Sequence, residues 1–176
     1  MIYGLGSTED EAKIIEFLDA SISATSGIRS QHTRYVYRAV GSTAIGRMAQ
    51  FDWMVSNFDA FKSYHGANLA SQANEIIGPF GEGGKTQSDI DKLQTFWDAN
   101  TSDLSGSASS LNQAIENVRA NMDWVENNYQ TVLDWVNTVI GSPLPSDTTT
   151  QTSGSGRVEE ACITALVFAG IFICMG

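Results

Sequence analysis

Apolar residues recur along residues 107–140 at alternating steps of four and three positions, which places them on one face of an α-helix. The stripe consists of Leu111, Ile115, Val118, Met122, Val125, Tyr129, Val132, Val136 and Val139, widened on one side by Trp124 and Trp135. A stripe this wide is typical of helices buried against other helices. Asn127 and Asn128 are poor helix formers and good N-caps, so we predict two packed helices with a tight joint between them. A two-stranded coiled coil is the alternative, although the flanking positions lack its Glu/Lys pattern.

Shorter helices are predicted before this stretch, over residues 8–23, 30–40, 44–55, 58–64, 69–77 and 88–100. Thr8 with Glu11 fits a capping box, and Ser88 with Asp91 opens the last of these helices in the same way. Gly78-Pro79 is expected to stop the fifth helix, and residues 81–84 to form a turn. Since no alternating run of β-branched residues is found, the sequence predicts an all-α domain over residues 1–141, built from consecutive antiparallel helix pairs.

The character of the chain changes after residue 141. Residues 142–160 are rich in Ser, Thr, Gly and Pro, and they cannot bury enough apolar surface to offset the entropy of ordering, so we expect a flexible stalk and spacer. Residues 161–176 end in an apolar run that is expected to form a short hydrophobic helix, shorter than the about 20 residues that cross a bilayer.

The order of small residues, polar spacer and terminal apolar run matches a glycosylphosphatidylinositol (GPI) anchor signal. Ser153, Gly154 and Ser155 are the candidate attachment residues. With such an anchor the mature protein loses both cysteines, Cys162 and Cys174, and lies on the extracellular face of the cell membrane. A transmembrane helix and a buried final helix are the alternatives.

The charges are unevenly spread. A net charge of −10 argues against a nucleic-acid partner, because phosphates would repel the surface. No acidic residue falls between Asp19 and Asp52, where four arginines are found: Arg29, Arg34, Arg38 and Arg47. Arg34 and Arg38 are i,i+4 neighbours on one helix face. Two interpretations stay open: the arginines pair with the acidic second half of the chain, or they line a cavity that attracts a carboxylate.

Groups that carry chemistry are sparse. His32 and His65 have no Cys or acidic residue at metal-ligand spacing and there is no H-E-x-x-H, so both are expected to be helix-surface histidines, and we predict no catalytic residue, metal ligand or cofactor site in this chain. Three carboxylates, Asp89, Asp91 and Asp98, suit a solvated helix face. Asn100-Thr101-Ser102 is an N-glycosylation sequon in a predicted loop, which indicates a secreted route. Met1 is not followed by a basic segment and an apolar run, so no signal peptide is expected at this position.

Four segments resemble, in order and spacing, the C-terminal helical domain of the aminopeptidase N family of zinc metallo-aminopeptidases. They are Ile-Arg-Ser-Gln at residues 28–31, Val-Gly-Ser-Thr-Ala-Ile-Gly-Arg at 40–47, Phe-Asp-Trp-Met-Val-Ser-Asn-Phe at 51–58 and Arg-Ala-Asn-Met-Asp-Trp at 119–124. The resemblance covers residues 2–140. Phe58 stands where a Trp is usual and Ala44 where a Pro is usual.

The resemblance implies a curved, HEAT-like array of helix pairs that closes over a catalytic domain, with its concave side around the peptide cavity. The zinc ligands and the catalytic glutamate belong to earlier domains of that family. By analogy the chain is a non-catalytic, C-terminal fragment of a cell-surface zinc aminopeptidase. Its partners are a peptide substrate, its own upstream catalytic domain and the membrane, and the four arginines are candidates for the cavity wall. The alternatives are a stand-alone GPI-anchored module that binds an extracellular protein, and a soluble helical dimer.

Overall fold

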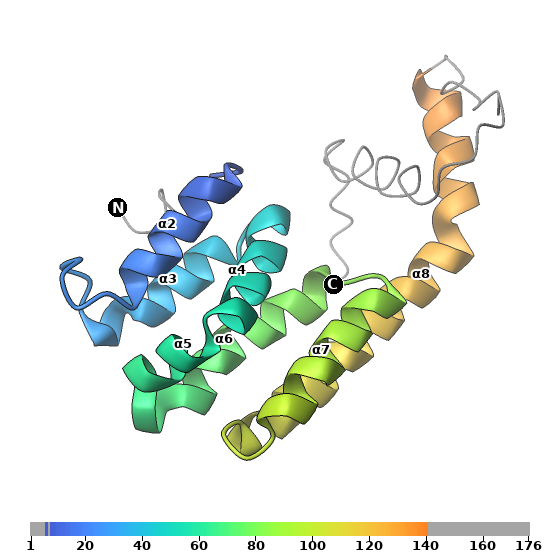
Figure 1. Cartoon of the computed structure of the whole chain (residues 1–176). Helices are drawn as coiled ribbons and strands as arrows, with labels where there is room; N and C mark the ends of the chain where they lie inside the picture. The colour runs from blue at the N-terminus through green and yellow to red at the C-terminus, as the bar shows by residue number, and fades with distance from the viewer. Residues whose placement is uncertain (1–5, 7, 141–176) are drawn as a thin grey trace, which may run out of the picture. The chain divides into compact units, whose positions relative to one another are not determined.

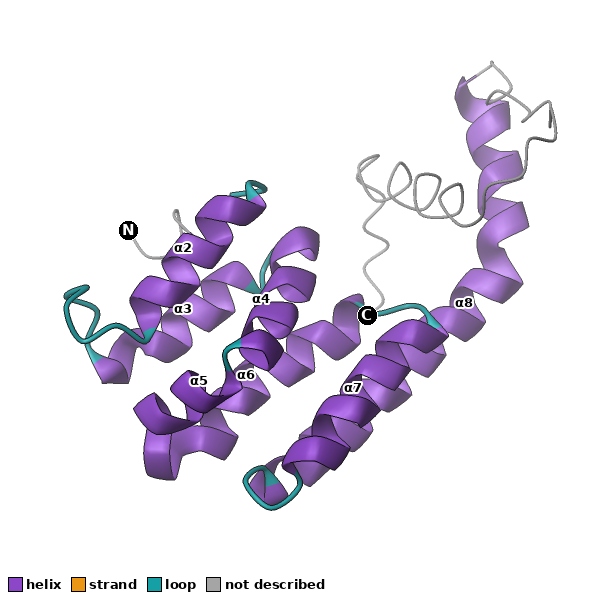
Figure 2. Ribbon diagram, viewed as in Figure 1, coloured by secondary structure: helices purple, strands orange, loops and turns teal. Residues whose placement is uncertain are grey.

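The computed structural model describes residue 6 and residues 8–140, and every regular element in this part of the chain is helical (Figures 1 and 2). The α-helices are α2 (Glu11–Ser21), α3 (Thr33–Val40), α4 (Ala44–Ser56), α5 (Phe58–His65), α6 (Leu69–Gly83), α7 (Gln87–Asn100) and α8 (Ala108–Ile140). Short 3-10 segments lie at η1 (Ser30–His32), η2 (Gly66–Asn68) and η3 (Ser105–Ser107). The prediction of an all-α domain is confirmed, and the HEAT-like curvature stays a prediction.

The backbone contacts divide the chain into two units, of which the first ends at Leu133. In the first unit α2 packs against α3 and α4, and α6 packs against the same two helices. Figure 1 shows α2 and α4 in front of α3 and α6, with α7 in front of the first half of α8. Helices that do not follow one another in the chain, such as α2 and α4 or α3 and α6, therefore pack together as well as sequential ones. The described residues of the second unit are 134–140, the last turns of α8.

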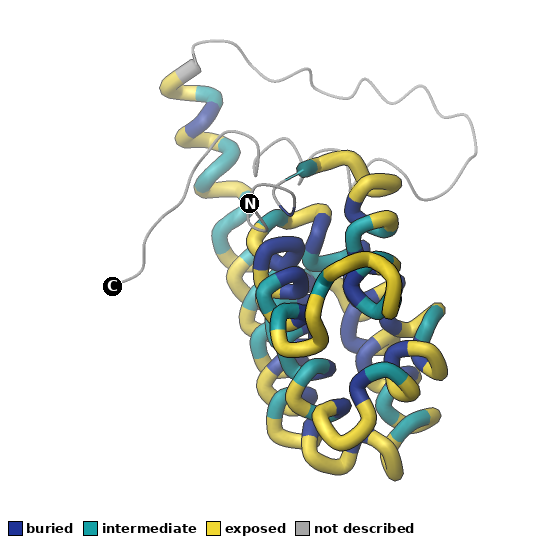
Figure 3. The backbone as a smooth tube through the Cα atoms, turned by 90° about the vertical axis from the view of Figure 1, so that its left-hand side faces the viewer, coloured by how far each residue is buried: buried dark blue, intermediate teal, exposed yellow. Residues whose placement is uncertain are grey.

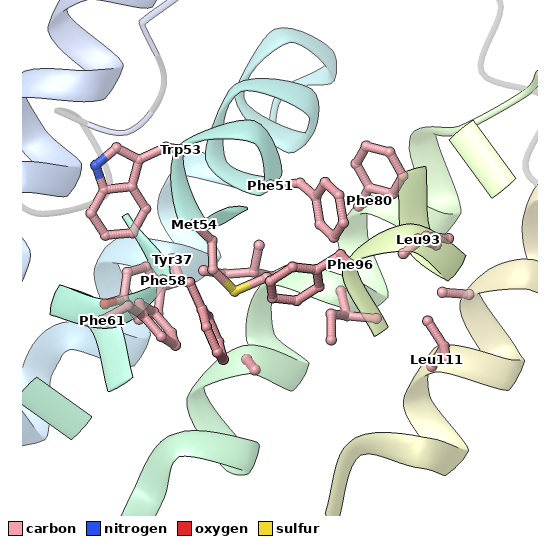
Figure 4. Close-up of a cluster of buried hydrophobic side chains, with 14 of the residues drawn as sticks. Tyr37, Phe51, Trp53, Met54, Phe58, Phe61, Phe80, Leu93, Phe96 and Leu111 are labelled. Atoms are coloured by element: carbon pink, nitrogen blue, oxygen red, sulfur yellow. The ribbon is translucent and has the colours of Figure 1, made fainter. Parts of the chain in front are cut away.

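Figure 3 marks the buried positions along the backbone, and Figure 4 shows that aromatic rings from α3 to α7 fill the core of the first unit. Phe51 of α4 stacks on Phe80 of α6 with ring centroids 4.1 Å apart. Phe58 of α5 meets Phe96 of α7 edge-on at 5.0 Å, so the ring that replaces the usual Trp is buried. Such pairs add about 0.5–1.5 kcal/mol beyond the area that they bury. The core is thus organised by aromatic contacts between helices.

Two predicted helix starts are corrected by the capping geometry. The N-cap of α2 is Asp10, whose carboxylate accepts the N–H of Lys13 at 3.3 Å, whereas Thr8 Oγ1 accepts only the N–H of Asp10. The capping box of α7 joins Thr86 to Asp89. Thr86 has the extended backbone that an N-cap needs, which Ser88, already inside the helix, lacks.

α6 does not stop at Gly78-Pro79, contrary to the sequence prediction. It continues through Pro79 to Gly83, so residues 81–83 are helical instead of forming a turn. A proline inside a helix costs about 3 kcal/mol. Burial of Phe80 against Phe51 and a close contact of Gly81 with α8 stabilise the last turn and offset that cost. Tertiary packing therefore overrides the local stop signal.

The predicted joint at Asn127 and Asn128 is wrong, because α8 runs unbroken for 33 residues. Each of these side chains donates from Nδ2 to the carbonyl four residues earlier, Asn127 to Asp123 at 2.7 Å and Asn128 to Trp124 at 2.8 Å. The amides therefore bond within the helix and do not cap a new one.

Burial of the α8 stripe decreases along the helix. Its first part is buried, namely Leu111, Ala114, Ile115 and Val118. From Met122 to Leu133 the apolar side chains are half-buried, and Trp124 is 43% exposed. In the second unit Val136 is buried, while Trp135 and Val139 are exposed. The prediction of a stripe buried along its whole length is therefore correct only for the first part.

Candidate functional site

α3 is the element that presents the arginine candidates. Its buried residues are Thr33, Val36, Tyr37, Ala39 and Val40. The positions left for solvent include Arg34 and Arg38, which lie one turn apart and are both exposed. The amphipathic pattern of the helix therefore aims both side chains outward from the core.

Arg38 is bound to an acidic residue of α6. Its Nε donates to Glu75 Oε2 and its Nη2 to Glu75 Oε1, each at 2.7 Å. Such two-pronged geometry is the strongest form of a guanidinium–carboxylate contact, although the pair is partly exposed, with 51% of the arginine and 21% of the glutamate side chain accessible. The interpretation as intradomain pairing holds for this arginine, but its partner precedes the acidic second half of the chain.

Arg34 is held by its sequence neighbour. Its Nη2 donates to the hydroxyl of Tyr35 at 2.9 Å, and its guanidinium carbon lies 4.8 Å from the centre of the Tyr35 ring. The imidazole of His32 lies near the Tyr35 ring, with ring centroids 6.2 Å apart. An aromatic contact of this kind orients a guanidinium and leaves it positively charged.

Arg47 and Arg29 lie at the two ends of α3. Arg47 of α4 is half-buried, and its Nε donates to the carbonyl of Gly41, the C-cap of α3, at 2.9 Å. A cation is favourable there because the helix dipole is negative at its C-terminus. Arg29 precedes η1, is exposed and makes no capping bond with its side chain. The four arginines are thus distributed along α3, and Arg34 and Arg38 alone share a face.

A buried polar group lies on the inner side of α3. The hydroxyl of Tyr37 is 2.8 Å from Nε2 of His65 in α5, and Ser21 of α2 donates to the same hydroxyl at 3.4 Å. Burial lowers the pKa of His65 to about 4 and raises the pKa of Tyr37. His65 is therefore neutral and buried, so its predicted place on the helix surface is wrong; His32 is half-buried.

The three carboxylates of α7 differ in role. Asp91 and Asp98 are exposed, as a solvated helix face requires. Asp89 is buried, contrary to the prediction, and its Oδ2 accepts the N–H groups of Lys85 and Thr86 at 3.0 Å each. Its charge is used to cap the helix, where the dipole favours an anion.

Metal ligands do not gather in the described part of the chain. Among residues 8–140, no group of three His, Cys, Asp or Glu side chains could hold a metal ion. Over the same residues, no helix is both long and apolar enough to cross a bilayer.

Comparison with known families assigns the domain. The profile of the ERAP1-like C-terminal domain family matches residues 1–120 of this chain. The chain belongs to this family. The predicted resemblance to the C-terminal domain of the aminopeptidase N family is thereby confirmed.

Several aminopeptidases are relatives of this ERAP1-like domain. The chain is 28% identical over 151 residues to a membrane alanyl aminopeptidase of Manduca sexta. These residues are 85% of the chain and 15% of the relative. It is 29% identical over 109 residues to aminopeptidase N of Bos taurus, covering 61% of the chain and 11% of the relative. Aminopeptidase A of Gloydius brevicauda is 27% identical to the chain over 139 residues, which are 77% of the chain and 14% of the relative. The chain thus spans no more than 15% of the length of these curated relatives.

The sequon lies at the end of α7 in the ERAP1-like domain. Asn100 is the last residue of the helix, half-buried, and its Nδ2 donates to the carbonyl of Phe96 at 2.8 Å. Thr101 and Ser102 are exposed. The candidate anchor residues, Ser153, Gly154 and Ser155, lie outside the described residues.

Sequence reasoning missed the residues that organise the arginines. Tyr35 is adjacent to Arg34, so the pairing could have been inferred from their proximity in the chain. Glu75 is 37 residues from Arg38, and no local pattern marks it as the partner. Long-range partners of this kind require the packing of α3 on α6.

Proposed function

We propose that this ERAP1-like domain is the non-catalytic, C-terminal lid of a cell-surface zinc aminopeptidase that removes N-terminal residues from peptides. Membership in a family shared with alanyl, glutamyl and N-type aminopeptidases is the observation that carries the proposal. In this proposal the zinc ion and the water that it activates belong to a catalytic domain preceding the residues described above. The contribution of this chain is to surround and orient the peptide beyond the bond that is cut.

Within this role, Arg34 is the arginine that best fits contact with a carboxylate of the peptide. Arg38 already carries a two-pronged contact with Glu75, and Arg47 is bound to a main-chain carbonyl. Arg34 is exposed, and it contacts the ring and the hydroxyl of Tyr35, which orient the guanidinium without neutralising it. Its remaining donors can bind both oxygens of a carboxylate.

Matched peptides test this assignment in the longer protein that carries the domain. Arg34→Ala should raise KM about fivefold for peptides with a free C-terminal carboxylate, the effect of an exposed charge contact of about 1 kcal/mol. The same peptides with a C-terminal amide should be unaffected. Arg119→Ala, which removes an exposed arginine of α8, is the control and should change neither substrate. An equal loss for both peptide series would contradict a carboxylate contact.

Placement at the cell surface has its own test. We propose that the chain is held on the membrane by a GPI anchor attached within residues 153–155 and that Asn100 carries a glycan. A phosphatidylinositol-specific phospholipase should release the protein from intact cells, and replacing the Ser-Gly-Ser triplet by bulky residues should prevent anchoring. Digestion with an N-glycosidase should reduce the apparent mass, and Ser102→Ala should abolish this shift. Protein that stays on the cells after the lipase treatment would argue against the anchor.

A further inference from the structure

A fully buried amide lies between α3, α4 and α6. Gln50 of α4 is 0% exposed, and neither its Nε2 nor its Oε1 reaches a hydrogen-bond partner among the described residues. A buried amide left in this state costs on the order of 1–3 kcal/mol for each unsatisfied group. Native interiors seldom keep such groups without a partner.

The surroundings of Gln50 are held in close contact. A Cβ atom placed on Gly41, the C-cap of α3, would lie 2.8 Å from Gln50 Nε2, 3.1 Å from the carbonyl oxygen of Tyr37 and 3.3 Å from Cβ of Pro79. The absence of a side chain at Gly41 therefore lets the amide approach the end of α3. The same point is close to the proline inside α6.

Pro79 supplies a second group in need of a partner. Because proline has no N–H, the carbonyl of Glu75, four residues earlier in α6, lacks the donor that an α-helix normally provides. Gln50 offers N–H donors and a carbonyl acceptor on the neighbouring helix. A Cβ atom on Gly41 would be close both to Gln50 Nε2 and to Cβ of Pro79, so the proline turn of α6 and the unpartnered amide are close to the same point at the end of α3.

We propose that Gln50 binds an internal water molecule that bridges its amide to the main chain of α6 next to Pro79. Water fits this site because it is small and can both accept from Nε2 and donate to a carbonyl oxygen. A cation would leave the amide donors unmet, since every group that could bind it would have to be an acceptor. Glu75 is also the partner of Arg38, so the water would tie the core to the α6 turn that holds an arginine of α3.

Methionine has nearly the shape of glutamine but no polar amide. Substitution of Gln50 by methionine should therefore have opposite effects on stability if the amide binds a water and if it is buried without a partner. If a water is bound, Gln50→Met leaves the water or the carbonyl unpaired, and the midpoint of thermal unfolding of the 176-residue chain should fall by several degrees. If the amide is simply buried without a partner, the same change should raise the midpoint. Leu93→Met, at a position that is also 0% exposed but wholly apolar, calibrates the effect of the flexible side chain.

A crystal structure of the unsubstituted chain at high resolution decides the matter directly. We expect an ordered water at hydrogen-bond distance, about 2.7–3.2 Å, from Gln50 and from a main-chain carbonyl of α6. A direct bond from the amide to a protein group, or a site filled by a side chain, would overturn the proposal. A rise in the unfolding midpoint of Gln50→Met relative to Leu93→Met would overturn it as well.

Discussion

Two regions of the first unit reach tight packing by opposite means. In the aromatic region, formed by Tyr37, Trp53, Phe58, Phe61 and His65 of α3–α5, large rings fill the space between helices (Figure 4). In the glycine junction, Gly81 of α6 and its C-cap residue Gly84 meet Ala114, Val118 and Asn121 of α8, and the backbones approach each other because side chains are missing.

The two regions are sensitive to opposite kinds of substitution. The aromatic region gains stability from the apolar area of its side chains, so it is damaged when atoms are removed. The glycine junction has no room between the two backbones, so it is damaged when atoms are added. The same methyl group is therefore favourable in one region and disruptive in the other.

The largest effect is expected from Phe61→Ala. Phe61 is fully buried and contacts the rings of Tyr37, Trp53 and His65. Its truncation should lower the free energy of unfolding by about 3–5 kcal/mol, measured by chemical denaturation. A loss below about 1 kcal/mol would show that the aromatic region does not depend on this ring.

Gly81→Ala tests the glycine junction with a single methyl group. The new Cβ would lie 2.5 Å from Cα of Ala114 and 2.8 Å from its carbonyl oxygen, both backbone atoms of α8 that cannot rotate away. We expect a loss of about 2–3 kcal/mol. Ser71→Ala, at an exposed position of the same helix, is the control. That change gains helix propensity and should be neutral or stabilise the chain by up to about 0.5 kcal/mol, and an equal loss for the two variants would refute the contrast.

The aromatic region contains a buried histidine, His65, which should make the stability of the chain depend on pH. The pKa of His65 is about 4 in the folded chain and near its ordinary 6.5 in the unfolded chain. Between these two values the unfolded chain binds a proton that the folded chain does not. The free energy of unfolding should therefore decrease as the pH falls from about 6.5 to 4, by on the order of 2 kcal/mol from this group.

His65→Gln, which keeps a polar partner for Tyr37, should make that decrease smaller by the same amount. Denaturation midpoints across the pH range, compared with those of His32→Gln, give the measurement. If the two variants show the same pH profile, His65 is not the group responsible.

Asn121→Ala should have the smallest effect. Its Nδ2 donates to the carbonyls of Glu82 and Gly84 at 3.1 and 2.8 Å, which satisfies the end of α6 from the side of α8. Loss of these bonds should lower the free energy of unfolding by about 1–2 kcal/mol. Asn127→Ala removes a bond within one helix and gains helix propensity, so it should be neutral or slightly stabilising.

The sequence predicts the aromatic region better than the glycine junction. Apolar spacing locates α4, α5 and α7 within one or two residues, because buried side chains repeat with the period of the helix. Gly78-Pro79 is predicted to stop the helix and residues 81–84 to form a turn, but in the structure α6 continues to Gly83. Their local preference is overridden by contacts with Phe51 and Ala114, residues that are distant in the chain.

The candidate site shows the same limit. The exposure of Arg34 and Arg38 on one face of α3 follows from their i,i+4 spacing. The different contacts of the two side chains do not follow from this spacing, because Arg38 pairs with Glu75 of α6 and Arg34 bonds to Tyr35. Likewise His65 is surrounded by rings from α3 and α5, and no pattern around residue 65 alone indicates its burial.

The indole of Trp53 gives the chain an internal spectroscopic reporter. Trp53 is 3% exposed and donates from Nε1 to Asp19 of α2 at 2.8 Å, whereas Trp124 is 43% exposed. Trp135, also in α8, is 55% exposed. An aqueous quencher should therefore reach the two indoles of α8 before that of Trp53.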